Sequence, residues 1–187
     1  MSLQRDLLNQ ARQLATHEPR RPRQASLRRA VSAAYYALFH LLVDAASREI
    51  VAGQGRDVLR QQVGRALGHA DMKKACQALV KWNPGAPPQP LDQLIPGGPD
   101  GRIVTVADAF VELQQARHEA DYDLSRRFSR TDVLALVGVA ERAFSAFQTM
   151  KKADENRRVF LCISCFMAAG NGRGWFICPG FHFLRPR

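Results

Sequence analysis

The chain has 187 residues, of which 46% are hydrophobic and 24% charged. This length suits one domain with an appendage or two small domains, and the apolar fraction excludes a wholly disordered chain. The 27 Lys and Arg residues outnumber the 17 Asp and Glu residues, for a formal net charge of +10. Residues 1–150 hold 20 basic and 15 acidic side chains and residues 151–187 hold 7 and 2, so a fifth of the chain carries half of the excess. This balance favours a polyanionic partner such as nucleic acid or anionic lipid, although a merely soluble basic protein has the same composition.

The N-terminal segment lacks the apolar core of a secretory signal, because Asp6 interrupts its amphipathic pattern. The longest uncharged run there covers residues 30–43 and includes Ser32, Tyr36 and His40, so it is too short and too polar to span a bilayer. We therefore expect a cytoplasmic protein without a membrane partner. Its four cysteines are then expected to be thiols or metal ligands rather than disulfides.

Apolar residues at spacings of three and four predict a helix over residues 3–15, and two prolines in residues 18–23 end it. The strongest helical pattern covers residues 24–51. It has one apolar stripe from Leu27 to Ala45 and a second from Tyr35 to Ile50, about 100° round the helix. An apolar arc this wide is typical of the central helix of a bundle.

Residues 56–82 are also predicted to be helical, with interruptions at Gly64 and Gly68 and a possible second cap at Asp71. Residues 83–101 hold six prolines and four glycines, so we expect a loop over residues 83–103 that is either a functional flap or a disordered insertion. Helix is expected to resume near Thr105, whose hydroxyl can cap it, and to run to about Leu124.

A last helix is expected from Ser129, because Ser129 and Asp132 have the spacing of a capping box. No segment of residues 1–150 alternates as a strand would, so this domain is predicted to be all-α, a bundle of about five helices.

Residues 151–187 differ from the rest and are expected to form a basic, non-helical tail rich in Cys, Phe and Gly. Cys162, Cys165, Cys178 and His182 have the spacing C-x2-C-x12-C-x3-H, which can close a tetrahedral zinc site. Three glycines stand where a zinc finger would place its helix, so the alternatives are a zinc knuckle without a helix and an unstructured or partly docked hydrophobic tail.

One charged residue falls on an apolar helical stripe. The face of Val106, Phe110 and Leu113 continues at Arg117, and a guanidinium in that position must be paired or solvated in a cleft. Asp121, one turn later, is the obvious partner. Arg117 therefore either forms an intrahelical bridge, reaches solvent between helices, or binds an anion.

On the long helix, Ser32, Tyr36 and His40 form a polar strip away from the main apolar stripe, and Tyr36 and His40 could face the helix of Arg117. A single helical histidine is more often an ordinary hydrogen-bonded residue than a catalyst. Arg, His, Tyr and Asp converging from two helices nevertheless form a plausible phosphodiester-binding group. The cations Arg28 and Arg29 oppose the macrodipole at the start of the long helix, which favours a phosphate partner. A solvated basic surface is the more common alternative for such a run of arginines.

The strings RRAVSAAYYALFHLL at residues 28–42 and ARHEADYD at residues 116–123 resemble motifs of the HEPN superfamily, in the branch with a YYA-x-FH helix and a late R-x-x-ADY motif. The resemblance covers roughly residues 3–150. It implies an up-and-down helical bundle, homodimerisation, association with RNA or nucleotide, and no cofactor for the bundle. Some members are metal-independent endoribonucleases of toxin-antitoxin or defence systems, and others pair with a small nucleotidyltransferase.

Catalytic members of the family carry a histidine four to six residues after the motif arginine. Here that arginine is Arg117, but Tyr122 stands in the histidine's place and His118 is turned about 100° away. A tyrosine serves poorly as an acid or base near neutral pH. If catalysis is retained, Arg117 would stabilise the phosphate and His40 or His118 would transfer the proton.

These residues and the resemblance are compatible with two functions. In the first, Arg117 grips a phosphate of RNA, Asp121 orients it, and Tyr36, Tyr122 and His40 position the substrate. In the second, the protein is a non-catalytic scaffold or antitoxin, in which Arg117, Asp121 and Tyr122 only lock helices together.

Overall fold

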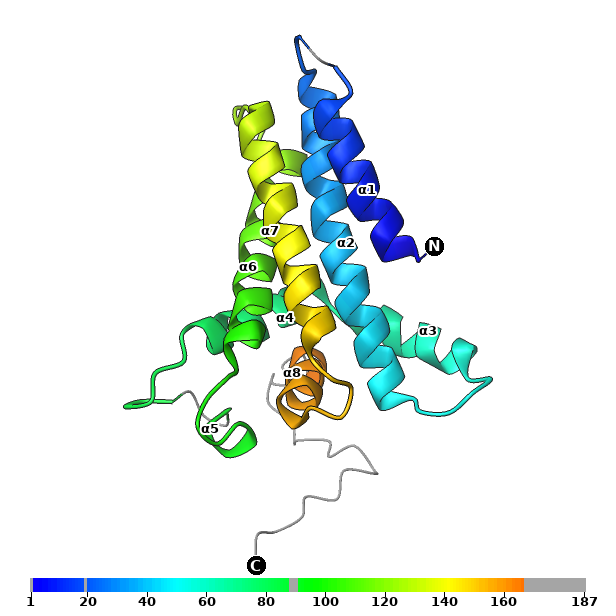
Figure 1. Cartoon of the computed structure of the whole chain (residues 1–187), viewed down its shortest axis with the longest axis vertical. Helices are drawn as coiled ribbons and strands as arrows, with labels where there is room; N and C mark the ends of the chain where they lie inside the picture. Colours follow the sequence, from blue (N-terminus) through cyan, green and yellow to red (C-terminus); the bar gives the residue numbers. More distant parts are fainter. Residues whose placement is uncertain (1, 19, 88–90, 167–187) are drawn as a thin grey trace, which may run out of the picture.

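The computed structural model describes residues 2–18, 20–87 and 91–166, without the side chains of residues 92 and 164–166. These residues form only helices, which confirms the all-α prediction (Figure 1). There are eight helical segments in the described residues rather than about five. They are α1 (Leu3–Thr16), α2 (Gln24–Ile50), α3 (Asp57–Ala66), α4 (His69–Val80), α5 (Leu91–Leu94), α6 (Gly101–Tyr122), α7 (Arg130–Thr149) and α8 (Glu155–Phe166).

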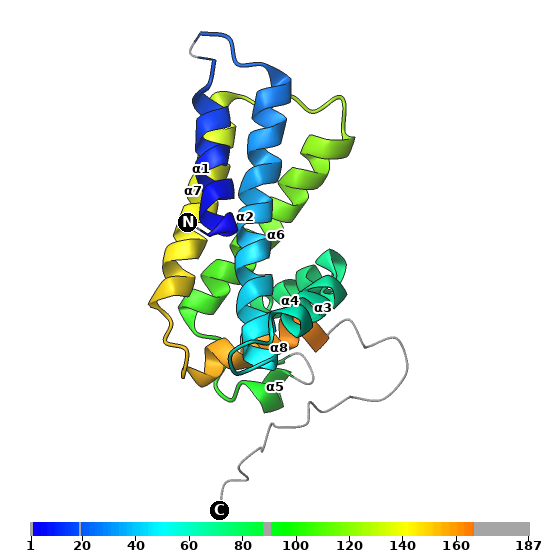
Figure 2. The ribbon, with the colours of Figure 1, turned by 90° about the vertical axis from the view of Figure 1, so that its right-hand side faces the viewer.

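The four longest helices, α1, α2, α6 and α7, run up and down along the long axis of the molecule (Figure 1). The helices α3, α4, α5 and α8 lie around the end of this bundle opposite the α1–α2 and α6–α7 loops (Figure 2). Helix α2 packs against α1, α6 and α7. Leu27, Val31, Ala34 and Leu38 of its main stripe are fully buried, as are Tyr35 and Leu42 of the second, so α2 is the central helix, as predicted.

By length and composition α2 could also cross a membrane. Of the apolar window that meets this test, 67% is buried within the protein, and the core helix of a soluble protein meets the same test. The packing on three sides accounts for the apolar surface of α2.

Helix ends agree with the predictions except in the region of α3 and α4 and at the start of α6. Helix α3 continues through Gly64, and α4 begins at His69 after Gly68, so Asp71 lies in its first turn and does not cap it. The capping box at the start of α7 is present, with Ser129 and Asp132 each accepting a backbone N–H of the other. Helix α6 begins at Gly101, four residues before the predicted start, because the side chain of Asp100 caps it by accepting the N–H of Arg102. The Thr105 hydroxyl instead donates back to the carbonyl of Gly101 inside the helix.

The proline-rich segment is held to the bundle by its own apolar side chains. Leu91 of the short helix α5 and Ile95 just after it are buried in the core. Gly98 follows with a φ of +91°, and a Cβ there would lie 2.5 Å from the Trp82 ring. Because α6 begins at Gly101, the loop ends at Asp100 rather than at residue 103.

The prediction of a non-helical tail is wrong for residues 155–166, which form α8. Val159, Phe160, Leu161 and Ile163 are buried, and α8 packs against α2, α4 and α6. Its more exposed residues, Glu155, Arg158 and Cys162, recur three and four residues apart, but this period lasts for only about three turns before the Gly-rich part of the tail. Of the predicted zinc ligands, Cys162 lies on α8, while Cys178, His182 and the side chain of Cys165 fall outside the described residues.

Candidate functional site: the α2–α6 seam

Polar side chains from α2 and α6 meet along the line where these two helices pack. The hydroxyl of Ser32 donates to Asp121 Oδ1 at 2.8 Å, and one turn further along, Nη2 of Arg117 donates to the hydroxyl of Tyr36 at 3.0 Å. Residues four apart on a helix share a face, so both pairs follow from the spacing in each helix. We call Ser32, Tyr36, His40, His69, Arg117 and Asp121 the seam.

Arg117 is the only charged residue on the apolar stripe of α6, and it is partly buried, with 24% of its side chain exposed. Its Nε lies 2.6 Å from Asp121 Oδ2, which is the ion pair expected from the sequence. The Nε–H does not point at the carboxylate, so the contact is a charge pair rather than an aligned hydrogen bond. Burial alone would lower the pKa of Arg117, but the facing Tyr36, Asp121 and Tyr122 side chains outweigh it and raise the pKa. Arg117 therefore stays cationic.

Two aromatic rings lie close to this guanidinium. The carbon of the Arg117 guanidinium lies 5.6 Å from the centre of the Tyr36 ring and 5.5 Å from that of Tyr122. Such a cation–π pair orients a guanidinium plane while leaving its N–H edge available. The Arg117 position thus combines a fixed orientation with remaining access to solvent.

Two histidines complete the seam, and sequence reasoning identified only one. His40 stacks on the Tyr36 ring with 6.2 Å between centres, as expected from their spacing. His69, the first residue of α4, stacks on the Phe39 ring at 4.0 Å and meets the edge of the Tyr36 ring at 6.1 Å. The carbonyl of His69 also accepts from Gln114 of α6 at 3.0 Å, which ties the start of α4 to α6. No local pattern around His69 signals this contact, because only the tertiary fold brings α4 to the seam.

The tautomer of His69 follows from its neighbour Tyr35. The Tyr35 hydroxyl lies 2.6 Å from His69 Nδ1, and no other hydrogen-bond partner of that hydroxyl is found among the described residues. Burial raises the pKa of Tyr35, so its hydroxyl stays protonated. The O–H therefore donates to Nδ1, and neutral His69 carries its proton on Nε2.

Both imidazoles are neutral near pH 7. Burial lowers the pKa of His40. Burial is also the main cause that lowers the pKa of His69, and the charges of Arg117 and His40 lower it further. A neutral imidazole is a competent proton acceptor, and a neutral Nε2–H is a hydrogen-bond donor.

The structure separates the two predicted phosphate ligands at the start of α2. Arg28 uses its guanidinium on the carbonyls that end α6. It donates to Ala120 at 2.7 Å, to Asp123 at 2.9 Å, and to Arg126. Arg29, the next residue, is exposed and makes none of these contacts. Arg28 is therefore placed as a helix cap, and Arg29 is placed on the surface.

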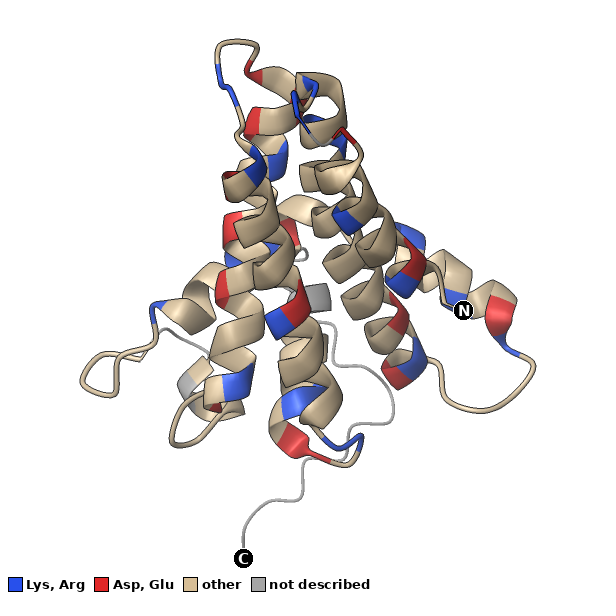
Figure 3. Ribbon diagram, turned by 45° about the horizontal axis from the view of Figure 1, so that its top comes forward, with Lys and Arg blue, Asp and Glu red and all other residues tan. Residues whose placement is uncertain are grey.

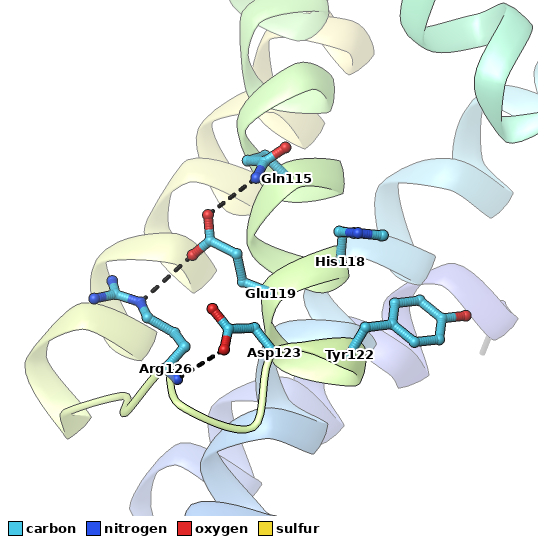
Figure 4. Close-up of a pocket in the computed structure, with 6 residues that line it drawn as sticks. All are labelled: Gln115, His118, Glu119, Tyr122, Asp123 and Arg126. Atoms are coloured by element: carbon cyan, nitrogen blue, oxygen red, sulfur yellow. Dashed lines mark hydrogen bonds and ion pairs between the residues drawn. The ribbon is translucent and has the colours of Figure 1, made fainter.

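His118 and Tyr122 lie outside the seam, along an open depression of about 840 Å³ on α6 (Figure 4). Their rings are 5.0 Å apart, and Tyr122 is 64% exposed. The depression also contains Glu119, which forms an ion pair with Arg126 at 3.4 Å. His118 is therefore next to Tyr122 rather than beside the Arg117–Tyr36 pair, as its position in the helix predicted.

No group of three or more His, Cys, Asp or Glu side chains suited to a metal occurs in the part of the chain that the structure describes. Cys76 is buried in the core of α4, and burial raises the pKa of its thiol. The seam itself offers a cation, a carboxylate, two imidazoles and hydroxyl groups. Comparison with protein-family models, with curated proteins and with solved structures gives no match for this chain.

Proposed function

We propose that this protein is an RNA-associated, HEPN-like helical domain that holds a backbone phosphate in the α2–α6 seam. The observation that supports this most is the Arg117 guanidinium, which is fixed by Tyr36 and Asp121 beside two neutral imidazoles. A partly buried cation costs free energy unless it is paired. A guanidinium held in one orientation can bind a phosphate through two parallel N–H groups, which suits an anion of fixed geometry.

In this proposal Arg117 donates to non-bridging phosphate oxygens with its free N–H groups. The Nε2–H of His69, whose ring meets the edge of the Tyr36 ring, supplies a neutral donor. Tyr36 holds the guanidinium, and the exposed Tyr122 ring offers a face on which a neighbouring base can stack. Asp121 holds the guanidinium in place and does not itself meet the phosphate.

The seam also holds the groups needed for weak metal-independent cleavage. His40 accepts the proton of the RNA 2′-hydroxyl, and the 2′-oxygen attacks the adjacent phosphorus. A 2′,3′-cyclic phosphate forms as the bond to the 5′-oxygen breaks, and that oxygen takes a proton from water. Arg117 stabilises the charge that develops on the phosphoryl oxygens.

We further propose that the domain acts as a homodimer in the cytoplasm, as a component of a toxin-antitoxin or defence system. These statements rest on the resemblance of residues 28–42 and 116–123 to the HEPN motifs.

A second candidate function is a non-catalytic scaffold that pairs with a small nucleotidyltransferase. It is favoured by the closed set of contacts between Ser32, Asp121 and Arg117, which joins α2 to α6 without any ligand. In that case the seam contributes stability alone.

Cleavage and stability assays on the same variants separate these candidates. Purified protein is incubated with total RNA in EDTA, together with the Arg117→Ala and His40→Ala variants. The exposed Arg142 of α7 provides a matched control, Arg142→Ala. We expect slow cleavage by the parent and the control, and loss of cleavage in both seam variants while circular dichroism shows them folded. Absence of cleavage and of RNA binding by the parent, with a lower melting temperature for Arg117→Ala, supports the scaffold instead.

A further inference from the structure

The basic charge of residues 1–150 is concentrated at one end of the bundle. Residues 18–29 and 123–132 together contain eight arginines and three acidic residues, for a net charge of +5. The rest of residues 1–150 contains twelve basic and twelve acidic residues, so its net charge is zero. The whole excess of this domain therefore comes from two short segments that are about 100 residues apart in the sequence.

These two segments lie together because the bundle runs up and down. The α1–α2 loop and the α6–α7 loop are at the same end, and arginine positions occur in both (Figure 3). Gln24 joins them by accepting the N–H of Phe128 at 3.0 Å and donating to its carbonyl at 2.8 Å. Arg130 donates to the carbonyl of Glu18 across the same gap. The loops thus form one continuous surface.

The acidic residues of this surface already have partners. Glu18 accepts from Ser26 at 2.8 Å, Asp123 accepts from the Ser125 hydroxyl at 2.6 Å, and Asp132 belongs to the capping box of α7.

Several arginines, by contrast, point outward. The Arg23 side chain is 82% exposed, and its Nε is as far as 4.0 Å from Glu18 Oε1, so this ion pair is weak. Four more are exposed and have no acidic side chain of the described residues within ion-pair distance: Arg20, Arg21, Arg29 and Arg127.

We infer that this surface, which we call the arginine end, binds the phosphate backbone of single-stranded RNA that extends from the seam. All eight of its cations are arginines, which bind phosphate through paired N–H groups, and none is a lysine. The depression with the exposed Tyr122 ring shares Asp123 and Arg126 with the arginine end, and that ring lies 5.5 Å from the Arg117 guanidinium carbon of the seam. A ring that can stack with a base beside a row of guanidinium groups is the usual arrangement of a single-strand binding surface. This inference rests on the proposed function, because it extends the same RNA beyond the phosphate at Arg117.

The salt dependence of RNA binding tests this inference. A fluorescent single-stranded RNA of about 20 nucleotides is titrated with the full chain by anisotropy at several salt concentrations. The test variant carries Arg20→Gln, Arg21→Gln and Arg127→Gln. The control variant carries Arg56→Gln, Arg65→Gln and Lys81→Gln, which remove the same charge from exposed positions elsewhere. Circular dichroism confirms that both variants are folded.

Each lost phosphate contact lowers the slope of log K against log salt by about 0.7 for a single strand. We therefore expect the test variant to lose about 2 from this slope and to bind about 10- to 100-fold more weakly near 0.1 M salt. The control variant should keep its slope within about 0.5.

Equal slopes in the test and control variants would overturn the inference, because the effect would then be one of net charge alone. So would binding of the parent to phosphatidylserine vesicles but not to RNA, since the arginine end would then be a membrane surface. If Arg117→Ala abolishes binding while the test variant binds normally, the proposed function stands and the arginine end fails. If the reverse holds, the arginine end stands without the seam.

Discussion

The adjacent residues Arg28 and Arg29 give a matched test of how the bundle is held together. Both are arginines in the first turns of α2, yet Arg28 donates to several carbonyls that end α6, and Arg29 is exposed. A hydrogen bond from a charged donor contributes about 1.5–3 kcal/mol, and a cation at a helix C-terminus adds about 0.3–1 kcal/mol. Two of the Arg28 hydrogen bonds are to carbonyls of the exposed loop after α6. These two bonds contribute less to the free energy of unfolding, because water can replace them.

We therefore expect Arg28→Ala to lower the free energy of unfolding by about 2–3 kcal/mol, which corresponds to roughly 4–12 °C in melting temperature for a chain of this size. Arg29→Ala should change it by less than about 0.5 kcal/mol. Urea denaturation followed by circular dichroism measures both variants under the same conditions. Equal stabilities for Arg28→Ala and Arg29→Ala would refute the assignment of Arg28 as the cap of α6.

Three further results are expected. Ser129→Ala removes the capping box of α7 and should cost about 1 kcal/mol in urea denaturation, whereas Ser129→Asp should retain most of that stability. The free energy of unfolding should fall as the pH drops below about 6.5, because the lowered pKa values of His40 and His69 let the unfolded chain take up protons first. A His40→Gln, His69→Gln variant that shows the same fall would contradict this cause. Arg117→Ala should raise the pKa of His69 in an NMR titration, since it removes a cation that disfavours protonation, and an unchanged pKa would place Arg117 too far away to matter.

The sequence was sufficient for the long helices whose apolar stripes or caps repeat over several turns. The bounds of α2 and the cap of α7 agree with the predictions because periodicity and capping are local properties. Helix α8 was missed because its period lasts for only about three turns and adjoins Gly-rich sequence. The start of α6 was placed at Thr105 because that residue resembles a cap, whereas Asp100 provides the actual cap.

The candidate site was only partly accessible from the sequence. The Arg117–Asp121 pair and the stacking of Tyr36 on His40 are consequences of helical spacing within single helices. His69 could not be placed, since its neighbours Tyr35 and Phe39 are about 30 residues away and belong to another helix. Arg28 was interpreted as a phosphate ligand because it opposes the dipole of its own helix. Arg28 instead binds the negative, C-terminal end of the α6 dipole, and no local sequence pattern links Arg28 to α6.

The central claim is that Arg117 binds an RNA phosphate, and the affinity of Arg117→Ala for RNA tests it most directly. Anisotropy titrations of the parent, Arg117→Ala and the control Arg142→Ala are compared with their melting temperatures. The account predicts that Arg117→Ala binds RNA at least about tenfold more weakly, a loss of about 1.4 kcal/mol, while Arg142→Ala binds as the parent does. An Arg117→Ala variant that binds RNA with the affinity of the parent, whatever its melting temperature, would contradict the claim.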